Sequence, residues 1–275
     1  MQRKPSGKSP GRGKPTTPAP EETIRLNKYI SQSGLCSRRE ADTLIAKGKV
    51  SVNGKPVLEV GTKVLPKDKV QVSGKTIKPE RKAYVLLNKP KDFITTMTDP
   101  EGRKTVMDLI KTATDQRVYP VGRLDRNTTG LLLFTNDGEL AEKLTHPSYM
   151  IKKIYQVDLD KPLTKEDLKK IQGGLTLDDG PVKVDEIAVL DKSRQILGVE
   201  IHLGRNRIVR RIFEHLGYDV KRLDRVMYGP LTKKDLSRGK WRLLEDKEIV
   251  MLTRLGGSKS KAPRPRKHKG GSLEE

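Results

Sequence analysis

The chain has 275 residues, which suits one or two domains, and carries a formal net charge of +22 at pH 7 with a pI near 10.0. Segments 1–20 and 256–275 hold +5 and +4 of that charge, so +13 remains on the residues between them. A region this basic most often faces a polyanion, because each Lys or Arg close to a phosphate releases a condensed counterion. The single cysteine, Cys36, excludes an internal disulfide and a cysteine-based metal cluster, and the four histidines lack metal-ligand spacing.

Both ends of the chain have the composition of disordered tails. Residues 1–22 and 256–275 are rich in Pro, Gly, Ser, Lys and Arg and offer almost nothing to bury. They are either flexible basic arms that add nonspecific RNA affinity or plain solubilising tails. The N-terminus lacks the apolar segment of a secretory signal, and no apolar run approaches the roughly 18 residues of a membrane span. We therefore expect a cytoplasmic protein with no membrane partner.

A first small folded unit is expected over residues 25–78. The spacing of apolar residues predicts one helix that ends at Gly34, and a second that begins with a capping box in SRRE and ends at Gly48. The stretch VSVNGKPV predicts two strands joined by a tight turn at Asn53-Gly54, and KVQVSGKTI predicts one further strand.

The exterior of this first unit is predicted to be basic. Arg38 and Arg39 fall in the first turn of the second helix, where free backbone N–H groups already favour phosphate. The unit resembles the small RNA-binding module first seen in ribosomal protein S-four, and RLNKYISQSGLCSRREADTLIAKGKVSVNGK follows its pattern. The resemblance implies RNA binding through the basic residues Arg25, Lys28, Arg38, Arg39, Lys47 and Lys49.

A second domain is expected over residues 83–252, after the polar linker KPERK. It opens with AYVLLNKPKDFITT, a buried-looking strand broken at Lys89-Pro90. Downstream, a helix is predicted to begin at Thr164 and end at Gly173-Gly174, VEIHL alternates as a half-buried strand, and RIVRRIFEHLG is an amphipathic helix. Strands and helices mixed without strict βαβ alternation predict an α+β fold with a mixed, largely antiparallel sheet flanked by helices.

The stretch GRLDRNTTGLLLFTNDGEL places one acidic residue, Asp125, in a short loop between two predicted strands, RVYPV and LLLF. An Asp in such a loop is usually a turn residue, since its side chain bonds its own backbone readily. The flanking Arg123 and Arg126 would instead hold an ionised carboxylate in place, as a nucleophile requires.

Two further motifs leave similar alternatives open. In KKIYQVDL, Tyr155 falls on one strand face and is either a core residue or a catalytic one. In LGRNRIVRRI, a turn opens the arginine-rich helix, whose polar side is predicted to carry Arg207, Arg210, Arg211 and Glu214. That side is either merely solvated, or it contacts phosphate or pairs with a buried acid.

Taken in order, these motifs resemble those of the ribosomal small-subunit-type (RsuA-like) pseudouridine synthase family, which also includes large-subunit rRNA enzymes. The resemblance covers about residues 25–252. It implies that Asp125 is the nucleophile, that Tyr155 stacks on the target base and serves in proton transfer, and that Arg210 pairs with the aspartate. It also implies substrate contacts by Arg123, Arg126, Thr128, Arg205, Asn206, Arg207 and the apolar side chain of Leu223.

The resemblance implies isomerisation of a uridine in ribosomal RNA, with GRLDRNTTGLLLF followed by DGELA favouring the large-subunit branch. Such an enzyme needs no metal, redox partner or nucleotide cofactor, acts on free rRNA or an assembling particle, and is expected to be monomeric. Two positions depart from the family pattern: Ile208 replaces a Gln or Glu, and Asp92 replaces a Gly. Asp tolerates the left-handed conformation that such a Gly adopts, so the loop is expected to survive.

Two other functions remain open at this stage. A noncatalytic RNA-binding assembly factor would use the same basic surfaces without chemistry. An RNA hydrolase would use Asp125 as a base, although the motifs hold neither paired carboxylates nor a catalytic histidine.

Overall fold

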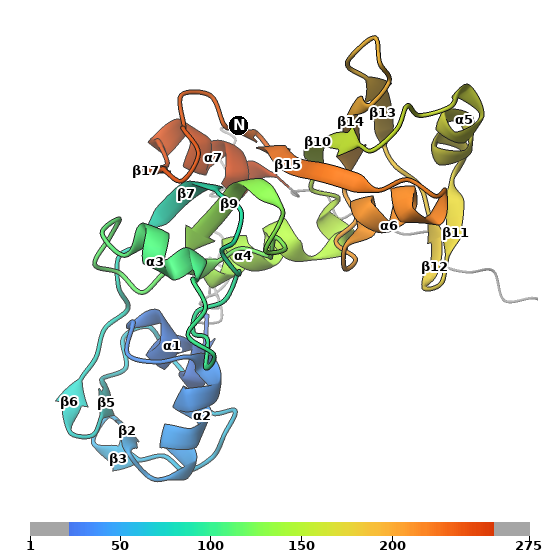
Figure 1. The fold of residues 1–275 in the computed structure, drawn as a ribbon. Helices are drawn as coiled ribbons and strands as arrows, with labels where there is room; N and C mark the ends of the chain where they lie inside the picture. The colour runs from blue at the N-terminus through green and yellow to red at the C-terminus, as the bar shows by residue number, and fades with distance from the viewer. Residues whose placement is uncertain (1–21, 256–275) are drawn as a thin grey trace, which may run out of the picture. The chain divides into compact units, whose positions relative to one another are not determined.

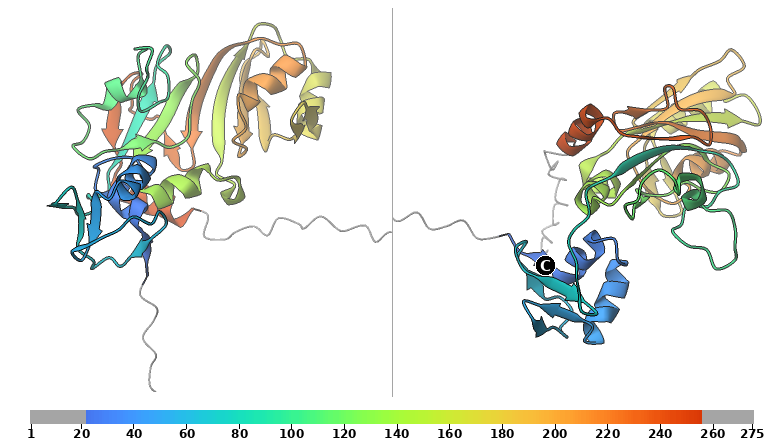
Figure 2. Two further views of the ribbon diagram at one scale, coloured as in Figure 1. Left: turned by 90° about the horizontal axis from the view of Figure 1, so that it is seen from below. Right: turned by 90° about the vertical axis from the view of Figure 1, so that its left-hand side faces the viewer.

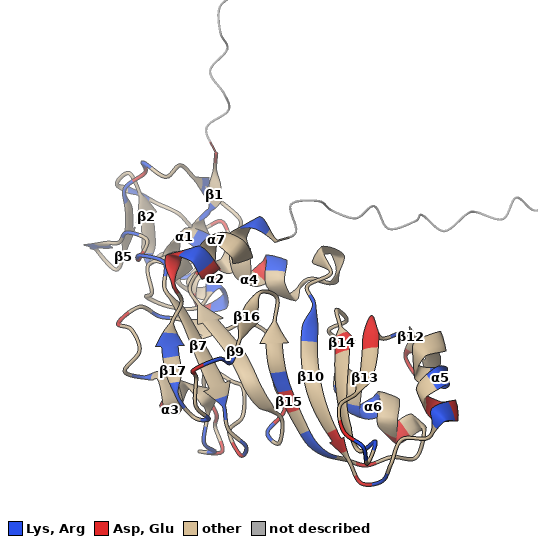
Figure 3. Cartoon of the chain, turned by 90° about the horizontal axis from the view of Figure 1, so that it is seen from above, with Lys and Arg blue, Asp and Glu red and all other residues tan. Residues whose placement is uncertain are grey.

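A computed structural model describes residues 22–255, and the chain divides between Pro79 and Glu80 into two compact units (Figure 1). Each unit has its own hydrophobic core, and Lys and Arg occur on helices and strands of both (Figure 3). The predicted tails 1–22 and 256–275 lie outside the described residues, except for residue 22.

The first unit consists of two helices and two small sheets. A four-stranded sheet has the order β3-β2-β5-β6, and β1 pairs with β4. Its core is built from apolar residues of both helices and of the strands, among them Leu26, Ile30, Ile45 and Val70. The elements are β1 (Ile24–Arg25), α1 (Leu26–Gln32), α2 (Arg38–Ala46), β2 (Val50–Val52), β3 (Lys55–Pro56), β4 (Lys63–Val64), β5 (Val70–Val72) and β6 (Lys75–Thr76).

Local sequence rules account for most of this unit. The capping box is confirmed, since Ser37 Oγ accepts a hydrogen bond from the Glu40 N–H and the Glu40 carboxylate accepts one from the Ser37 N–H. The Asn53-Gly54 turn is confirmed as well, with both residues at positive φ. The prediction of a single strand in KVQVSGKTI is wrong. Ser73 and Gly74 also adopt positive φ and fold this segment into the β5–β6 hairpin.

The second unit is built on one nine-stranded sheet, whose central strands run side by side (Figure 2). The strand order is β13-β14-β10-β15-β9-β7-β17, with β16 on β15 and β8 on β9. All of these pairs are antiparallel except β15 with β9. The α+β class and the antiparallel-rich sheet are therefore confirmed.

The strands of the second unit are β7 (Tyr84–Lys89), β8 (Tyr119–Pro120), β9 (Thr129–Thr135), β10 (Lys153–Leu159), β11 (Leu175–Leu177), β12 (Gly180–Val182), β13 (Glu186–Val189), β14 (Ile196–Ile201), β15 (Val220–Tyr228), β16 (Leu231–Thr232) and β17 (Trp241–Leu243). Its helices are α3 (Val106–Ile110), α4 (Gly138–Thr145), the single 3-10 turn Pro147–Tyr149, α5 (Lys165–Gly173), α6 (Ile208–His215) and α7 (Asp246–Arg254). Strands β11 and β12 form a separate hairpin.

Helices cover both faces of the sheet. Alternate side chains of β7 and β9 belong to different clusters, so Val85 and Leu132 pack with α3, whereas Leu86 and Leu133 pack with α4 and α7. Further along the sheet, Val157 and Leu223 pack with α6. The helix predicted after Thr164 is confirmed as α5, with Thr164 as its N-cap.

At Gly130 the backbones of β15 and β9 leave no room for a side chain. Its φ is 104°, and a Cβ built there would lie 2.3 Å from the Arg225 carbonyl oxygen and 2.6 Å from the Arg225 nitrogen. Gly180, at φ 106°, has no atom within 4 Å of such a Cβ. Only glycine therefore allows this parallel pairing.

We expect Gly130→Ala to lower the free energy of unfolding by about 3 kcal/mol, because backbone overlap adds to backbone strain. The matched variant Gly180→Ala carries the strain alone and should lose about 1 kcal/mol. Urea denaturation of both variants measures the difference, and equal losses would contradict the close approach at Gly130.

Candidate active site

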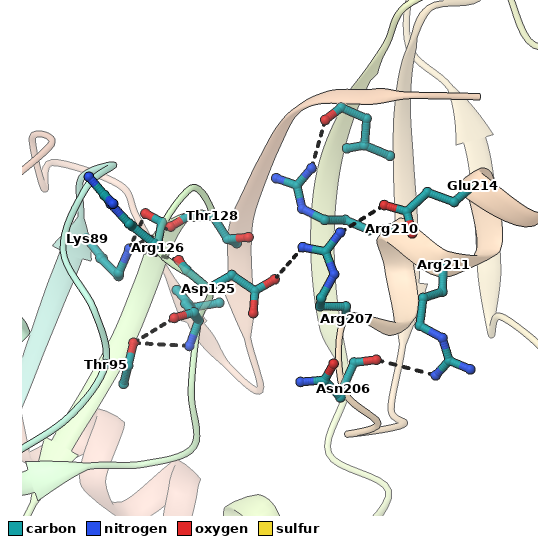
Figure 4. A network of polar contacts seen from close by, with 12 residues as sticks. Lys89, Thr95, Asp125, Arg126, Thr128, Asn206, Arg207, Arg210, Arg211 and Glu214 are labelled. Carbon is teal, nitrogen blue, oxygen red and sulfur yellow. Dashed lines mark hydrogen bonds and ion pairs between the residues drawn. The ribbon is translucent and has the colours of Figure 1, made fainter. Parts of the chain in front are cut away.

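A fully buried lysine holds the loop between β8 and β9 through hydrogen bonds to its backbone. Lys89, the last residue of β7, has no exposed surface, and its Nζ donates to the carbonyls of Pro90 (3.1 Å), Asp125 (3.0 Å), Arg126 (3.1 Å) and Thr128 (2.9 Å). An ammonium has three N–H donors, so these acceptors share them. The backbone from the Asp125 carbonyl to Thr128 is thereby fixed to the end of β7 (Figure 4).

Two neighbouring residues, Thr95 and Asp92, complete the support of this loop. Thr95 Oγ1 donates to the Leu124 carbonyl at 2.8 Å and accepts from the Leu124 N–H. The Asp92 N–H donates to the Arg126 carbonyl at 3.0 Å, and the Asp92 carboxylate lies 3.3 Å from Arg126 Nε. Asp92 has φ 67°, so the prediction that it adopts the left-handed conformation is confirmed.

The carboxylate of Asp125 faces the beginning of α6. Its Oδ2 lies 3.7 Å from Nη1 of Arg207, whose Nη2 donates to Glu214 at 2.9 Å (Figure 4). Arg207 is the N-cap of α6 and has φ 47°. The expectation that the flanking arginines hold Asp125 was wrong for Arg126, which pairs with Asp92 instead. The cation that contacts Asp125 comes from 82 residues further along the chain, where no local pattern could reveal it.

Arg210 lies on the buried side of α6, contrary to the predicted polar side. It is 8% exposed, and its Nη1 donates to the Val220 carbonyl of β15 at 2.8 Å. Burial, followed by the charge of Arg207, lowers the pKa of Arg210, and the charge of Asp125 acts in the opposite direction. Its Nε is buried without a hydrogen-bond partner among the described residues, and the structure records no ion pair between it and Asp125.

Tyr155 and Leu223 lie on the sheet face that α6 covers. Val157 of β10 is paired with Leu223 of β15, and both belong to the cluster that contains α6. Tyr155, two residues before Val157, is half-buried and packs against this cluster and against the one that contains α3. It therefore lies between the two halves of this face.

The β11–β12 hairpin fixes two arginines that flank the start of α6. Asp179 accepts hydrogen bonds from Arg211 at 2.7 and 2.9 Å and lies 3.5 Å from Arg205 Nη1. Arg211 pairing lowers the pKa of Asp179 to about 2. The Asn206 carbonyl also faces Arg211, at 3.5 Å. The predicted contact residues Arg205, Asn206 and Arg207 thus form one turn beside Asp125.

Arg123 and Thr128, the remaining predicted contact residues, differ in exposure. Arg123 is exposed, whereas Thr128 is 2% exposed and its hydroxyl is buried. Thr128 therefore supports the loop through its carbonyl.

In the first unit, the predicted RNA-binding residues are exposed, except for Lys28, which is partly buried. Arg38 and Arg39 occupy the first turn of α2.

The chain is similar to known proteins in family, in sequence and in structure. A family described as RNA pseudouridylate synthase matches residues 83–215, and the S4 domain matches residues 24–70. An RNA pseudouridine synthase of Aquifex aeolicus is 43% identical over 89% of this chain and 99% of its own length. The ribosomal large subunit pseudouridine synthase B of Bacillus subtilis is 44% identical over 84% of this chain and 96% of its own length.

The chain belongs to the RNA pseudouridine synthase family. A dual-specificity RNA pseudouridine synthase of Escherichia coli is 36% identical over 90% of this chain and 84% of its own length. A crystal structure of a pseudouridylate synthase superimposes with a TM-score of 0.61 at 27% identity, over 83% of this chain and 99% of that one. The family resemblance found in the sequence is therefore confirmed, together with the S4 module.

This pseudouridine synthase contains functional candidates that the sequence did not reveal. Lys89 ends an apolar strand immediately before a proline, and that placement was the available clue to its burial. Lys153 is another: its Nζ donates to the His202 carbonyl at 2.9 Å, and burial lowers its pKa to about 8. Between residues 22 and 255 no group of three or more His, Cys, Asp or Glu side chains could hold a metal ion. None of the helices in that range is both long and apolar enough to cross a bilayer.

The buried ammonium of Lys89 gives a prediction for stability against pH. Burial lowers the pKa of Lys89 to about 8, and the charges of Asp125 and Asp92 act in the opposite direction. An unfolded lysine titrates near about 10.4, so between these values the unfolded chain binds more protons and stability rises with pH. We expect the free energy of unfolding of the native chain, minus that of Lys89→Met, to increase by about 2 kcal/mol from pH 8 to pH 10. Urea denaturation across this range measures it, and a constant difference would contradict the lowered pKa of the buried Lys89.

Proposed function

We propose that this protein isomerises a uridine of ribosomal RNA to pseudouridine, with Asp125 as the nucleophile. The observation that carries the proposal is the placement of Asp125 in a chain of this family. Its carboxylate stands on a loop fixed by Lys89 and faces Arg207 at the start of α6. It is 37% exposed, so it remains open to a substrate.

The reaction breaks the C1′–N1 glycosidic bond, turns the base and joins C1′ to C5, which expels the hydrogen at C5. An ionised carboxylate is needed either to attack the sugar or to promote departure of the base. The positive charges of Arg207 and the buried Arg210 attract the negative charge on Asp125. We propose that Arg210, with its unpartnered Nε, becomes the direct partner of this carboxylate when RNA is bound.

The base has to leave its stack to reach Asp125, which costs a few kcal/mol. We propose that Tyr155 stacks on the extruded base and serves in proton transfer, and that Leu223 packs against the base. Both lie on the sheet face under α6. Arg123, Arg126 and Arg205 would hold the distorted backbone, since each is at the surface beside the loop or the turn.

We propose large-subunit 23S rRNA as the target. The relative of Bacillus subtilis is named as a large-subunit enzyme, and the first unit matches an RNA-binding module. We further propose a monomer that acts in the cytoplasm without a small-molecule cofactor; Asp125, Tyr155 and Arg207 all belong to the second unit of the same chain.

Asp125→Asn tests the assignment. We expect it to abolish tritium release from rRNA carrying [5-³H]uridine while leaving RNA affinity nearly unchanged, because the charge removed is negative. Release by the native chain alone supports the proposal. Substantial release by the variant would remove Asp125 from its role. Absence of release from free rRNA and from precursor particles would favour a noncatalytic assembly factor, and strand cleavage would favour a hydrolase.

The S4 module gives a separate prediction. We expect Arg38→Ala with Arg39→Ala to reduce the slope of log K against log salt by about 1.5, because each phosphate contact contributes about 0.7–0.9. The control replaces Lys69 and Lys75, two exposed lysines of the same unit, by Ala. Filter binding at several salt concentrations measures both pairs, and equal slopes would mean that the first turn of α2 contacts no phosphate.

A further inference from the structure

A polar pocket of about 430 Å³ lies on the face of the sheet opposite to α6. Along β10, Gln156 and Asp158 alternate with Tyr155, and along β15, Asp224 follows Leu223. These polar side chains therefore point away from α6. Basic and acidic positions stand next to one another on β15 (Figure 3). The pocket is lined by Lys91, Thr129, Gln156, Asp158, Arg222, Asp224 and Arg238.

The floor of the pocket is a satisfied ionic cluster. Asp224 is 9% exposed and accepts from Thr129 Oγ1 at 2.9 Å and from Arg238 at 3.1 Å, and Lys233 contacts it as well. Two cations compensate its charge, and the hydroxyl adds a third hydrogen-bond donor. This cluster links β15 to β9 and stabilises the floor of the pocket. Because the Asp224 carboxylate is already satisfied, it is not expected to contact a ligand.

The charged side chains in the wall of the pocket have fewer partners. Lys91 is exposed and makes no ion pair among the described residues. The side chain of Arg222 is 76% exposed and lies 4.0 Å from Asp158. The Asp158 carboxylate also accepts from Gln156 Nε2 at 3.2 Å, yet is 20% exposed and keeps room for further N–H donors. The wall therefore offers two cations, Lys91 and Arg222, that can bind an anion. Beside them, the carboxylate of Asp158 and the amide of Gln156 can form hydrogen bonds with a polar group.

The pocket is continuous along the backbone with the active-site loop. Lys91 follows Lys89, which holds the loop, and precedes Asp92, which bonds Arg126. Thr129 is four residues after Asp125. Two of the residues that line the pocket, Lys91 and Thr129, therefore belong to the segments that hold the Asp125 loop.

We infer that this pocket binds one nucleotide of the substrate RNA other than the target uridine. Lys91 and Arg222 hold its phosphate, and Asp158 and Gln156 accept and donate at its base edge. Its volume lies within the range of sites that enclose a small ligand, about 300–1,000 Å³. This inference rests on the proposed function, because it concerns the RNA that Asp125 acts on.

Arg222→Ala and Lys91→Ala in the full chain test the inference. We expect each to weaken rRNA binding about tenfold and to lower the salt slope by about 1, while the single-turnover tritium release at saturating RNA stays within about twofold. Lys192→Ala, at an exposed lysine between β13 and β14, is the matched control and should change neither. Unchanged thermal unfolding confirms that each variant is folded.

A second measurement identifies the base contact. Abasic substitutions, placed one at a time on either side of the target, should weaken binding by the native chain at one position. For RNA that is abasic at that position, Asp158→Asn should bind with the same affinity as the native chain. Binding of Arg222→Ala and Lys91→Ala equal to that of Lys192→Ala would overturn the inference, as would an abasic scan with no sensitive position. Either result leaves the proposed function intact provided that the native chain releases tritium and Asp125→Asn does not.

Discussion

The candidate site depends on one buried charge. An ammonium removed from water carries a large desolvation penalty unless hydrogen bonds replace the lost hydration. Lys89 meets this condition with backbone carbonyls from the C-terminal half of the loop and from Pro90. Because these acceptors belong to residues 125, 126 and 128, offsetting the charge also fixes the backbone around Asp125. Stability and geometry are therefore coupled at this point.

The sheet supplies the rest of the arrangement. The parallel pairing of β15 with β9 brings the strand that carries Leu223 beside the strand that follows the Asp125 loop. Gly130 permits this approach, and a hydrogen bond from the Thr129 hydroxyl to the Asp224 carboxylate links the two strands. Helix α6 then packs on β10 and β15 and presents Arg207 to Asp125. Residues distant in sequence thus meet because two strands lie next to one another.

Features governed by neighbouring residues could be predicted from the sequence. The capping box at Ser37, the Asn53-Gly54 turn and the left-handed Asp92 each follow from a local rule, and the motif around Asp125 was specific enough to indicate the family. Features governed by long-range packing could not. Arg210 has helical spacing with the exposed Arg207 and Glu214, yet its own side chain is buried and donates to the Val220 carbonyl. The sequence showed Lys89 only as the end of a strand, because three of its four acceptors lie more than 30 residues away.

The measurement that tests the account most directly is the single-turnover rate of Lys89→Met at saturating rRNA, alongside its RNA affinity. A displacement of a reacting group by about 1 Å can cost about 100-fold in rate. The account predicts a loss of this size with a dissociation constant like that of the native chain, at a temperature where both are folded. Lys192→Met, an exposed lysine removed without burial effects, should keep the native rate. A Lys89→Met rate within about threefold of the native one would contradict the account, because Asp125 would then hold its position without the buried ammonium.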